Sequence, residues 1–330
     1  MKEFLITKND AGQRLDRFVS KSVPLLPASL AQKYIRLKRV KVGGKAAPRD
    51  YKLAAGDVVS MYINDEFFVP PDGIDLYPGV KGPAPDLLYE DDNILLVNKE
   101  AGVLCHSGQK GGAKHEAPAT LISRIQSYLS TNGEWRPEEE NSFAPALCNR
   151  IDRNTSGIVI AAKNAEALRV INDKIKQREI DKLYLAAVHG VPDPPSGSLE
   201  GYLFKDAVKN RVYIRKESRP GTKKAVTEYR TVATTGRLSL LECKLITGRT
   251  HQIRAQLADC GRPLLGDGKY GNGRLDRVYS ETMQALCSYK LIFAFKSDAG
   301  MLSYLSGREF RVSGVEFVKK NFPDIDILLL

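Results

Sequence analysis

Four apolar runs follow one another between residues 184 and 245, and no helical pattern separates them. They occupy residues 184–188, 212–214, 224–231 and 238–245. Parallel strands need long, usually helical crossovers, whereas strands that follow one another without helices pair antiparallel. Earlier apolar runs at residues 93–97 and 157–162 alternate with helical patterns at residues 117–131 and 164–176. This order predicts an α+β domain with a mainly antiparallel, mixed sheet flanked by helices and loops, and it argues against a doubly wound fold.

The N-terminal part of the chain has the pattern of a small module of its own. An apolar-periodic segment after Arg14 predicts a first helix that ends near Pro24, and Ser29 is expected to cap a second helix. An alternating strand with a Gly-Gly turn follows at residues 39–45, and another strand follows at residues 57–63. The pattern predicts two helices and a hairpin.

Positive charge is concentrated in this module. The 330 residues carry 50 Lys plus Arg against 39 Asp plus Glu, a formal net charge of +11, and the first 70 residues hold 13 basic against 7 acidic side chains. Such a surplus favours a polyanionic partner, nucleic acid before a membrane surface. The alternative is a solvated face that protects an edge hairpin from aggregation. Six cations fall where the second helix meets the hairpin: Lys33, Arg36, Lys38, Arg39, Lys41 and Lys45.

Composition divides the chain into three parts. Residues 69–85 are rich in proline and glycine, which predicts a semi-rigid linker between a module at residues 1–68 and a larger domain at residues 86–330. The five cysteines are widely spaced and form no C-x-x-C pair. They predict reduced thiols, with neither a disulfide framework nor a metal site. No signal core or membrane-spanning run is evident, so a cytoplasmic protein with no membrane partner is expected.

The segment that carries the strongest chemical signal is a polar loop that leads into the apolar run at residues 157–162. It places Asp152 between Arg150 and Arg153. Neighbouring cations favour the ionised form of a carboxylate, and a rigid strand positions it, as a nucleophile or a charge stabiliser requires. The alternative is a structural ion pair in a turn, and the local pattern alone does not decide between the two.

A second polar segment, residues 247–267, offers a cation for this carboxylate. A strand ends at Gly248, and Thr250 is expected to cap a helix that extends to residue 260. In a regular helix Thr250 and Arg254 lie on one face near the positive N-terminal end, where anions bind favourably. The pattern therefore predicts an anion-binding helix start that is able to meet Asp152.

Taken together, the motifs resemble those of the RluA-type RNA pseudouridine synthases. The first module is similar to the small RNA-binding module, of the alpha-L type, first described in a ribosomal small-subunit protein. The resemblance covers nearly the whole chain in the family's order. It implies an isomerase that acts on RNA, most often large-subunit ribosomal RNA, as a monomer and without a cofactor or metal. The matching segments are residues 98–106, 149–157, 182–184 and 247–270.

The resemblance also implies roles for individual residues. Asp152 corresponds to the catalytic aspartate, which either attacks carbon 1′ or removes a proton from carbon 2′; both routes stay open. Arg254 corresponds to its salt-bridge partner, with Arg249 as the second choice. Tyr184 corresponds to an active-site tyrosine that stacks on uracil and takes the proton from carbon 5, its phenol beside a cationic network.

Base extrusion gives the resemblance a further implication. The target uridine must leave its helix because carbon 1′ and the faces of the base are otherwise inaccessible. Arg150 corresponds to the residue that enters the vacated space. Further RNA contacts are expected from three residues near these motifs and from the basic cluster of the module: Arg153, Arg249 and Thr250, with Lys33, Arg36, Lys38, Arg39 and Lys41.

Two positions depart from the family pattern. Asn149 stands where the family commonly has His, and Glu100 stands where it commonly has Pro. An amide keeps a hydrogen bond but does not titrate, which puts in doubt any acid/base role at residue 149. Glu100 only removes a backbone restraint after a strand.

Three other functions compete with this interpretation. One is a non-catalytic RNA-binding or ribosome-assembly factor, which would need none of the predicted catalytic residues in particular. Another is the same reaction on transfer RNA. A glycoside hydrolase needs two carboxylates around one bond, and only Asp267 is a conceivable companion for Asp152.

Overall fold

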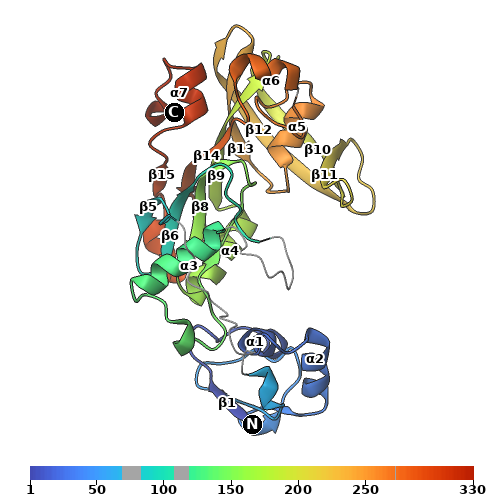
Figure 1. The fold of residues 1–330 in the computed structure, drawn as a ribbon, viewed down its shortest axis with the longest axis vertical. Helices are drawn as coiled ribbons and strands as arrows, with labels where there is room; N and C mark the ends of the chain where they lie inside the picture. Colours follow the sequence, from blue (N-terminus) through green and yellow to red (C-terminus); the bar gives the residue numbers. More distant parts are fainter. Residues whose placement is uncertain (69–82, 108–118, 272) are drawn as a thin grey trace.

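The computed structural model describes residues 1–68, 83–107, 119–271 and 273–330. The N-terminal module forms a small antiparallel sheet with two helices against it (Figure 1). The sheet has the order β1-β4-β2-β3, and a separate apolar core lies between it and the helices. Its elements are β1 (Lys2–Leu5), α1 (Leu15–Ser22), α2 (Ala28–Arg36), β2 (Val40–Val42), β3 (Lys45–Ala46), β4 (Val58–Met61) and the 3₁₀-helix η1 (Asp65–Phe67).

The predicted pair of helices and the hairpin are confirmed, but one predicted cap is wrong. Ser29 lies inside α2, and the residue at the N-cap is Pro27, with no side-chain cap hydrogen bond. Proline suits the start of a helix because its fixed φ is compatible with the first turn and its missing N–H would have no helical partner there. The predicted cap therefore lies two residues beyond the observed N-cap.

The larger part of the chain is built on one sheet. Among the described residues, eleven strands belong to it, and nine follow the order β11-β10-β12-β13-β9-β14-β8-β6-β5, while β15 pairs with β14 and β7 with β8. Every pairing in it is antiparallel except that of β8 with β14. The predicted α+β fold is confirmed. The strands are β5 (Leu87–Glu90), β6 (Ile94–Lys99), β7 (Ala146–Leu147), β8 (Ser156–Ala162), β9 (Ile180–His189), β10 (Ser196–Asp206), β11 (Arg211–Arg215), β12 (Thr222–Thr235), β13 (Leu238–Leu245), β14 (Leu286–Phe293) and β15 (Glu309–Arg311).

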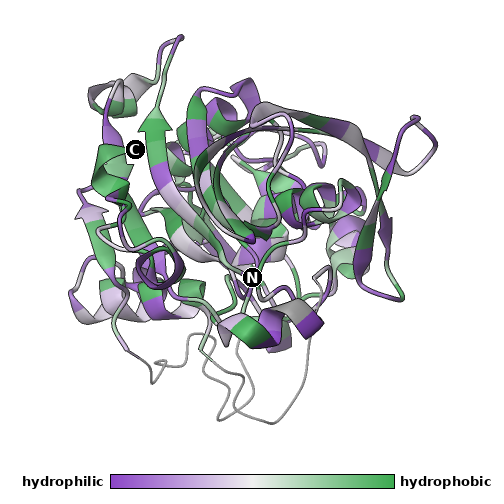
Figure 2. Ribbon diagram, turned by 90° about the horizontal axis from the view of Figure 1, so that it is seen from above, coloured by the Kyte–Doolittle hydropathy of each residue, from purple (hydrophilic) through white to green (hydrophobic). Residues whose placement is uncertain are grey.

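Helices cover both faces of this sheet. On one face α3 (Leu121–Thr131) and α5 (Gln252–Asp259) bury apolar side chains against β6, β8, β9 and β13. On the other face α4 (Ala165–Gln177) and the C-terminal segments pack, and Figure 2 shows hydrophobic residues gathered along the central strands. The remaining elements are α6 (Gly273–Tyr279), α7 (Glu316–Asn321), η2 (Pro137–Glu139), η3 (Gly300–Leu305) and η4 (Ile327–Leu329). In the part of the chain that the structure describes, no helix is long and apolar enough to span a membrane.

Two of the long strands of the sheet, β10 and β14, were not among the predicted strands. β10 begins Ser-Gly-Ser-Leu-Glu-Gly, a composition typical of loops, and it becomes a strand because β11 and β12 pair with it on either side. β14 fills the gap between β8 and β9, so its place depends on segments far away in the sequence. Tertiary pairing decided both.

The predicted boundaries of the three parts stay a prediction, since residues 69–82 of the linker lie outside the described residues. The module nevertheless contacts the large domain directly, through hydrogen bonds. Asp10 is fully buried and accepts hydrogen bonds from Asn141 Nδ2 (2.8 Å) and Ser142 Oγ (2.5 Å). Asn9 Oδ1 accepts from Ala165 N at the start of α4 (3.2 Å). The position of the module thus depends on polar contacts as well as on the linker.

We expect Asp10→Ala to loosen this contact. The substitution removes the carboxylate that accepts from the partly buried Asn141 and Ser142 side chains. A hydrogen bond contributes about 0.5–1.5 kcal/mol, so losing both should lower the unfolding free energy by about 1–3 kcal/mol. Small-angle scattering should show a larger radius of gyration, and proteases should separate the module more quickly. Asp50→Ala, which removes an exposed carboxylate of the same module, is the matched control. Equal protease resistance of both variants would contradict the expected role of Asp10.

Candidate active site

A cleft of about 740 Å³ opens beside the large sheet, at the loop between β7 and β8 and the start of α5. Of the residues that line it within the described ranges, one has a carboxylate, namely Asp152. The cleft thus combines a single anion with a strongly cationic lining, which suits a polyanionic ligand. Six Lys or Arg side chains line it: Arg150, Arg153, Lys182, Lys205, Arg249 and Arg254.

Asp152 lies in the tight turn that precedes β8. Its backbone carbonyl accepts a hydrogen bond from Thr155 N (3.1 Å), which closes the turn. Its side chain is 24% exposed and faces the cleft, where Oδ2 accepts from Arg254 Nη1 at 2.8 Å. The predicted ion pair between Asp152 and Arg254 is confirmed. Arg249, the second choice, instead donates to the carbonyl of Lys224 (3.4 Å).

Arg254 is shared between two carboxylates. It projects from the first turn of α5 and donates through Nε and Nη2 to both oxygens of the buried Asp267, each at 2.8 Å. Its guanidinium also lies 5.3 Å from the centre of the Tyr270 ring. Burial lowers the pKa of Arg254. The hydrogen bonds and the charge of Asp267 raise it by a larger amount, so the net shift is upward. Arg254 is therefore a permanent cation in a fixed orientation.

Tyr184 lies on β9 with its side chain 5% exposed, and it lines the same cleft. Burial raises the pKa of its phenol well above the usual value, and the charge of Asp152 acts in the same direction. Tyr184 shares this cleft with the six Lys and Arg side chains, although the charge that shifts its pKa is that of Asp152. Its hydroxyl is protonated at neutral pH.

Comparison with known proteins matches the sequence to one family. Residues 93–259 match the model of the family described as RNA pseudouridylate synthase, a segment that includes Asp152, Tyr184 and Arg254. The chain belongs to this family. It is 31% identical over 281 residues, 84% of this chain and 82% of the relative, to ribosomal large subunit pseudouridine synthase C of Escherichia coli (strain K12). It is 29% identical over 282 residues to the Vibrio cholerae protein of the same name, with 82% and 81% of the two chains covered.

Solved structures agree with the fold of this synthase. The structure titled Human RNA Pseudouridylate Synthase Domain Containing 4 superimposes with a TM-score of 0.53 at 21% identity, covering 70% of this chain and 89% of the other. That likeness supports the α+β architecture. As members of this family are isomerases that convert uridine to pseudouridine, the chain is an RNA pseudouridine synthase.

Lys99 lies in a segment that matches the family but had no predicted role, and it is one of the most buried side chains in the synthase, at 1% exposure. Its ammonium donates to three backbone carbonyls, those of Glu100 (2.7 Å), Val103 (2.9 Å) and Arg153 (3.0 Å). Burial lowers the pKa of Lys99 to about 8. Lys99 thereby fixes the backbone immediately after Asp152. A lysine at the end of a strand that begins with four apolar residues was the signal that could have identified it.

Asp267 is the second residue whose role the sequence did not reveal. It is 1% exposed, and its Oδ1 also accepts from the backbone N–H groups of Lys269 (2.9 Å) and Tyr270 (3.1 Å). Burial would raise the pKa of Asp267, but Arg254 and, to a smaller extent, the two backbone N–H groups lower it, so the net shift is downward. Asp267 orients the arginine and does not line the cleft, so it is no second catalytic carboxylate of the kind a hydrolase needs.

The predicted helix after Gly248 exists, but its predicted cap is wrong. α5 begins at Gln252, and the N-cap residue is His251 in the left-handed conformation, with φ of 53°. Thr250 therefore lies outside the helix and does not share a helical face with Arg254, although it lines the cleft. His251 Nδ1 lies 3.0 Å from Tyr270 Oη, and its Nε2 lies 3.9 Å from Asp152. Burial lowers the pKa of His251.

Asn149, the departure from the family pattern, has a structural contact. Its Oδ1 accepts a hydrogen bond from Ile160 N on β8 (2.8 Å), next to the bond from Cys148 N to the Ile160 carbonyl (2.8 Å). The amide side chain thus continues the β7–β8 pairing where the main chain turns away toward Asp152. This contact needs a hydrogen-bond acceptor and no titration.

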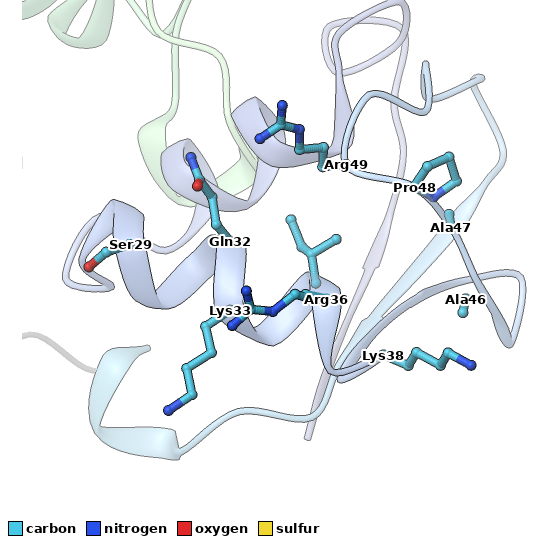
Figure 3. A pocket seen from close by; sticks show the side chains of 10 residues that line it. Ser29, Gln32, Lys33, Arg36, Lys38, Ala46, Ala47, Pro48 and Arg49 are labelled. Atoms are coloured by element: carbon cyan, nitrogen blue, oxygen red, sulfur yellow. The ribbon is translucent and has the colours of Figure 1, made fainter.

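The remaining predicted residues lie on the cleft or on the module. Arg150 is exposed at the cleft, while Arg153 donates through Nε to the carbonyl of Gly102 (3.0 Å). In the module, a pocket of about 590 Å³ brings together Lys33, Arg36 and Lys38 with Arg49 (Figure 3). Arg39 and Lys41 lie over the rings of Tyr34 and Tyr62, at 5.5 and 5.2 Å. No group of three or more His, Cys, Asp or Glu side chains able to hold a metal ion occurs in the described ranges.

Proposed function

We propose that this synthase converts specific uridines of large-subunit ribosomal RNA to pseudouridine, with Asp152 as its catalytic carboxylate. One observation carries the proposal: among the described residues, a cleft lined by six Lys or Arg side chains contains a single carboxylate, and that carboxylate is paired with the buried Arg254. The cations match the phosphates of a nucleic acid, and the carboxylate matches a reaction at a sugar carbon.

The reaction needs one anionic group at the ribose. The bond between uracil nitrogen 1 and carbon 1′ breaks, the base turns within the site, and carbon 5 forms the new bond to carbon 1′ and loses its proton. Asp152 either attacks carbon 1′ or removes the proton from carbon 2′. Both routes require an ionised carboxylate at the start, and the 2.8 Å contact with Arg254 supports that form.

Tyr184 and Arg150 have complementary roles in the proposal. The buried ring of Tyr184 offers an apolar surface on which the turning uracil stacks. Its raised pKa keeps the phenol protonated, which favours this positioning role over proton removal from carbon 5. Arg150, exposed at the cleft, occupies the space that the uridine leaves when it is extruded from its helix.

The choice of ribosomal RNA rests on relatives and on the module. The relatives from Escherichia coli and Vibrio cholerae are named for the large ribosomal subunit. The module adds a basic pocket on a separate surface, as recognition of folded RNA requires. We therefore infer that the module binds rRNA outside the target nucleotide, and that the protein works as a monomer in the cytoplasm.

The proposal is tested by mapping pseudouridine in cells that lack this protein. Large-subunit rRNA should lose pseudouridine at one or a few positions, and a plasmid copy of the wild-type gene should restore it. Transfer RNA from the same cells is the internal comparison. Loss confined to transfer RNA would replace the proposed substrate, and unchanged modification of every RNA would overturn the proposal.

The RNA-binding role of the module gives a separate prediction. Changing Lys38, Arg39 and Lys41 to Ala should weaken rRNA binding and flatten its dependence on salt. Each phosphate that the protein no longer neutralises lowers the logarithmic salt slope by roughly 0.7 to 0.9. Fluorescence anisotropy over a series of salt concentrations measures the slope. Lys319→Ala, which removes an exposed lysine from α7, is the control, and an unaltered slope in the triple variant would make the cluster a plain solvated surface.

A further inference from the structure

The sheet continues beyond the active site as a three-stranded arm made of β10, β11 and β12 (Figure 1). One face of this arm packs on α5. Leu203, Val212 and Ala225 are at most 5% exposed and form one apolar cluster with Ala255 of the helix. Because side chains alternate along a strand, their neighbours in sequence lie on the opposite face, away from α5.

That opposite face carries three aromatic side chains, which we call the aromatic face. Strand register places Tyr213 opposite Phe204 and Arg215 opposite Tyr202. Tyr213 is 39% exposed, and Tyr202 and Phe204 are partly exposed. Among the described residues, no apolar layer of this chain covers these rings. Partly exposed aromatic rings that lie together on adjacent strands often mark a binding surface.

Cations are interleaved with these rings. The Arg215 guanidinium lies 5.2 Å from the centre of the Phe204 ring, and Lys224 pairs in register with Tyr202. Residues 196–224 hold eight Lys plus Arg against three Asp plus Glu, a surplus of five. The first 70 residues hold a surplus of six, so these two segments account for the whole net charge of +11. Nearly half of the net charge that attracts a polyanion thus comes from the arm.

The arm is connected to the catalytic cleft. Lys205 and Asn210, at the tip of the β10–β11 hairpin, line that cleft. The hydroxyl of Tyr270 accepts a hydrogen bond from Val212 N (2.8 Å) and contacts His251 Nδ1 (3.0 Å), beside Asp152. A polynucleotide that leaves the cleft past the hairpin tip therefore reaches the aromatic face.

We propose that the aromatic face binds unpaired nucleotides of the RNA substrate, with bases stacked on Tyr213, Tyr202 and Phe204 and phosphates near Arg215 and Lys224. A sheet face with aromatic rings between cations fits single-stranded RNA, because every base stacks on a ring and every linkage carries a negative charge. The proposal rests on the proposed function only in taking RNA as the ligand. It adds a second binding surface, separate from the module, which selects targets beside an unpaired segment.

The test is the binding of a fluorescein-labelled oligouridylate of roughly twelve nucleotides, a length within the range that stacking surfaces cover. It is measured by anisotropy with full-length protein that carries Asp152→Ala, so the result does not depend on catalysis. In this background Tyr213→Ala should weaken binding about five- to hundredfold, the usual effect of losing one stacked base. Tyr213→Phe, which keeps the ring, should bind within about twofold of the parent.

Two controls separate the aromatic face from general effects. Tyr304→Ala removes an exposed tyrosine of η3 and should leave binding unchanged. Thermal unfolding reports whether a variant is folded. Tyr213 is more exposed than Tyr202 or Phe204, so its replacement should disturb the fold least among the three aromatic side chains. Equal affinity of Tyr213→Ala and Tyr213→Phe overturns the proposal. So does a wild-type dimer in sedimentation that Tyr213→Ala dissociates, because the face would then bind a second copy of the chain.

Failure of this proposal and failure of the proposed function are distinguishable. If Tyr213→Ala and Tyr213→Phe bound the oligouridylate equally, the aromatic face would be excluded as a binding surface, but modification of rRNA by the wild-type protein would be unaffected. Conversely, an Asp152→Ala protein that still formed pseudouridine would remove the catalytic assignment and leave the binding measurement valid.

Discussion

The Asp152→Ala protein is expected to form pseudouridine at least about ten-thousandfold more slowly than the wild type, the scale on which loss of a catalytic nucleophile acts. No other carboxylate among the described residues lines the cleft, so no neighbour can replace it. Release of tritium from RNA labelled at carbon 5 of uridine measures the reaction directly, because that carbon loses its hydrogen when the new bond forms. Complementation of cells that lack the protein gives the same answer in rRNA.

The structure explains why this variant should remain folded. Arg254 keeps both of its 2.8 Å contacts with Asp267 when Asp152 is removed, so no unpaired buried charge is created. Asp152→Asn is the matched variant, since it keeps the shape and removes only the charge. Turnover of either protein within tenfold of the wild type would show that Asp152 is not the catalytic carboxylate.

Arg254→Ala is expected to have the largest effect on stability. The substitution leaves the buried Asp267 without its partner, and removing one member of a buried pair costs about 3–5 kcal/mol of unfolding free energy. It also removes the only Arg within hydrogen-bonding distance of Asp152 among the described residues, so activity should fall as well. Chemical denaturation measures the first effect and tritium release the second. Arg254→Lys keeps the charge but not the two parallel hydrogen bonds to Asp267. Its unfolding free energy and its activity should therefore lie between those of the wild type and Arg254→Ala.

The unfolding free energies of the wild type and Arg254→Ala should depend differently on pH. In the wild type the pKa of Asp267 is lowered in the folded state. Its contribution is therefore fully present above the ordinary aspartate pKa of about 3.9 and is lost as the pH falls through the lower folded value. In Arg254→Ala, Asp267 keeps its burial and its two backbone N–H bonds but loses the arginine, so its pKa should lie higher than in the wild type. Acidification should then protonate the unpaired carboxylate and narrow the difference in unfolding free energy between the variant and the wild type. A gap that stays constant or widens below about pH 5 would contradict the pairing.

The part of this site that the sequence could predict is the part that local order encodes. Asp152 between two arginines, followed by an apolar strand, is a contiguous pattern, and Arg254 came from a second contiguous pattern. Asp267 was harder, because its role depends on a chain reversal between α5 and the following turn that brings it back to Arg254. Lys99 acquires its role only when three carbonyls from separate positions converge on it.

The fold shows the same limit. Apolar alternation found β8, β9 and β13, whose two faces are both buried. It missed β10, whose polar and glycine-rich sequence forms a strand only between two partners. The cap expected at Thr250 was wrong because His251 adopts a positive φ, a conformation that is uncommon for any residue other than glycine. The sequence thus allowed prediction of features encoded by neighbouring residues, but not of contacts between segments that are distant along the chain.

The sharing of Arg254 between Asp152 and Asp267 has a consequence for the energetics of the whole catalytic cycle. On either proposed route Asp152 gives up its negative charge, by forming an ester or by taking a proton. An arginine with only that partner would then be a buried cation with nothing to balance it. Here the buried Asp267 is bonded to the arginine as well, and its lowered pKa favours the ionised form. The scaffold beneath the reacting carboxylate thus remains electrically neutral, and the protein has little dielectric rearrangement to make between one intermediate and the next.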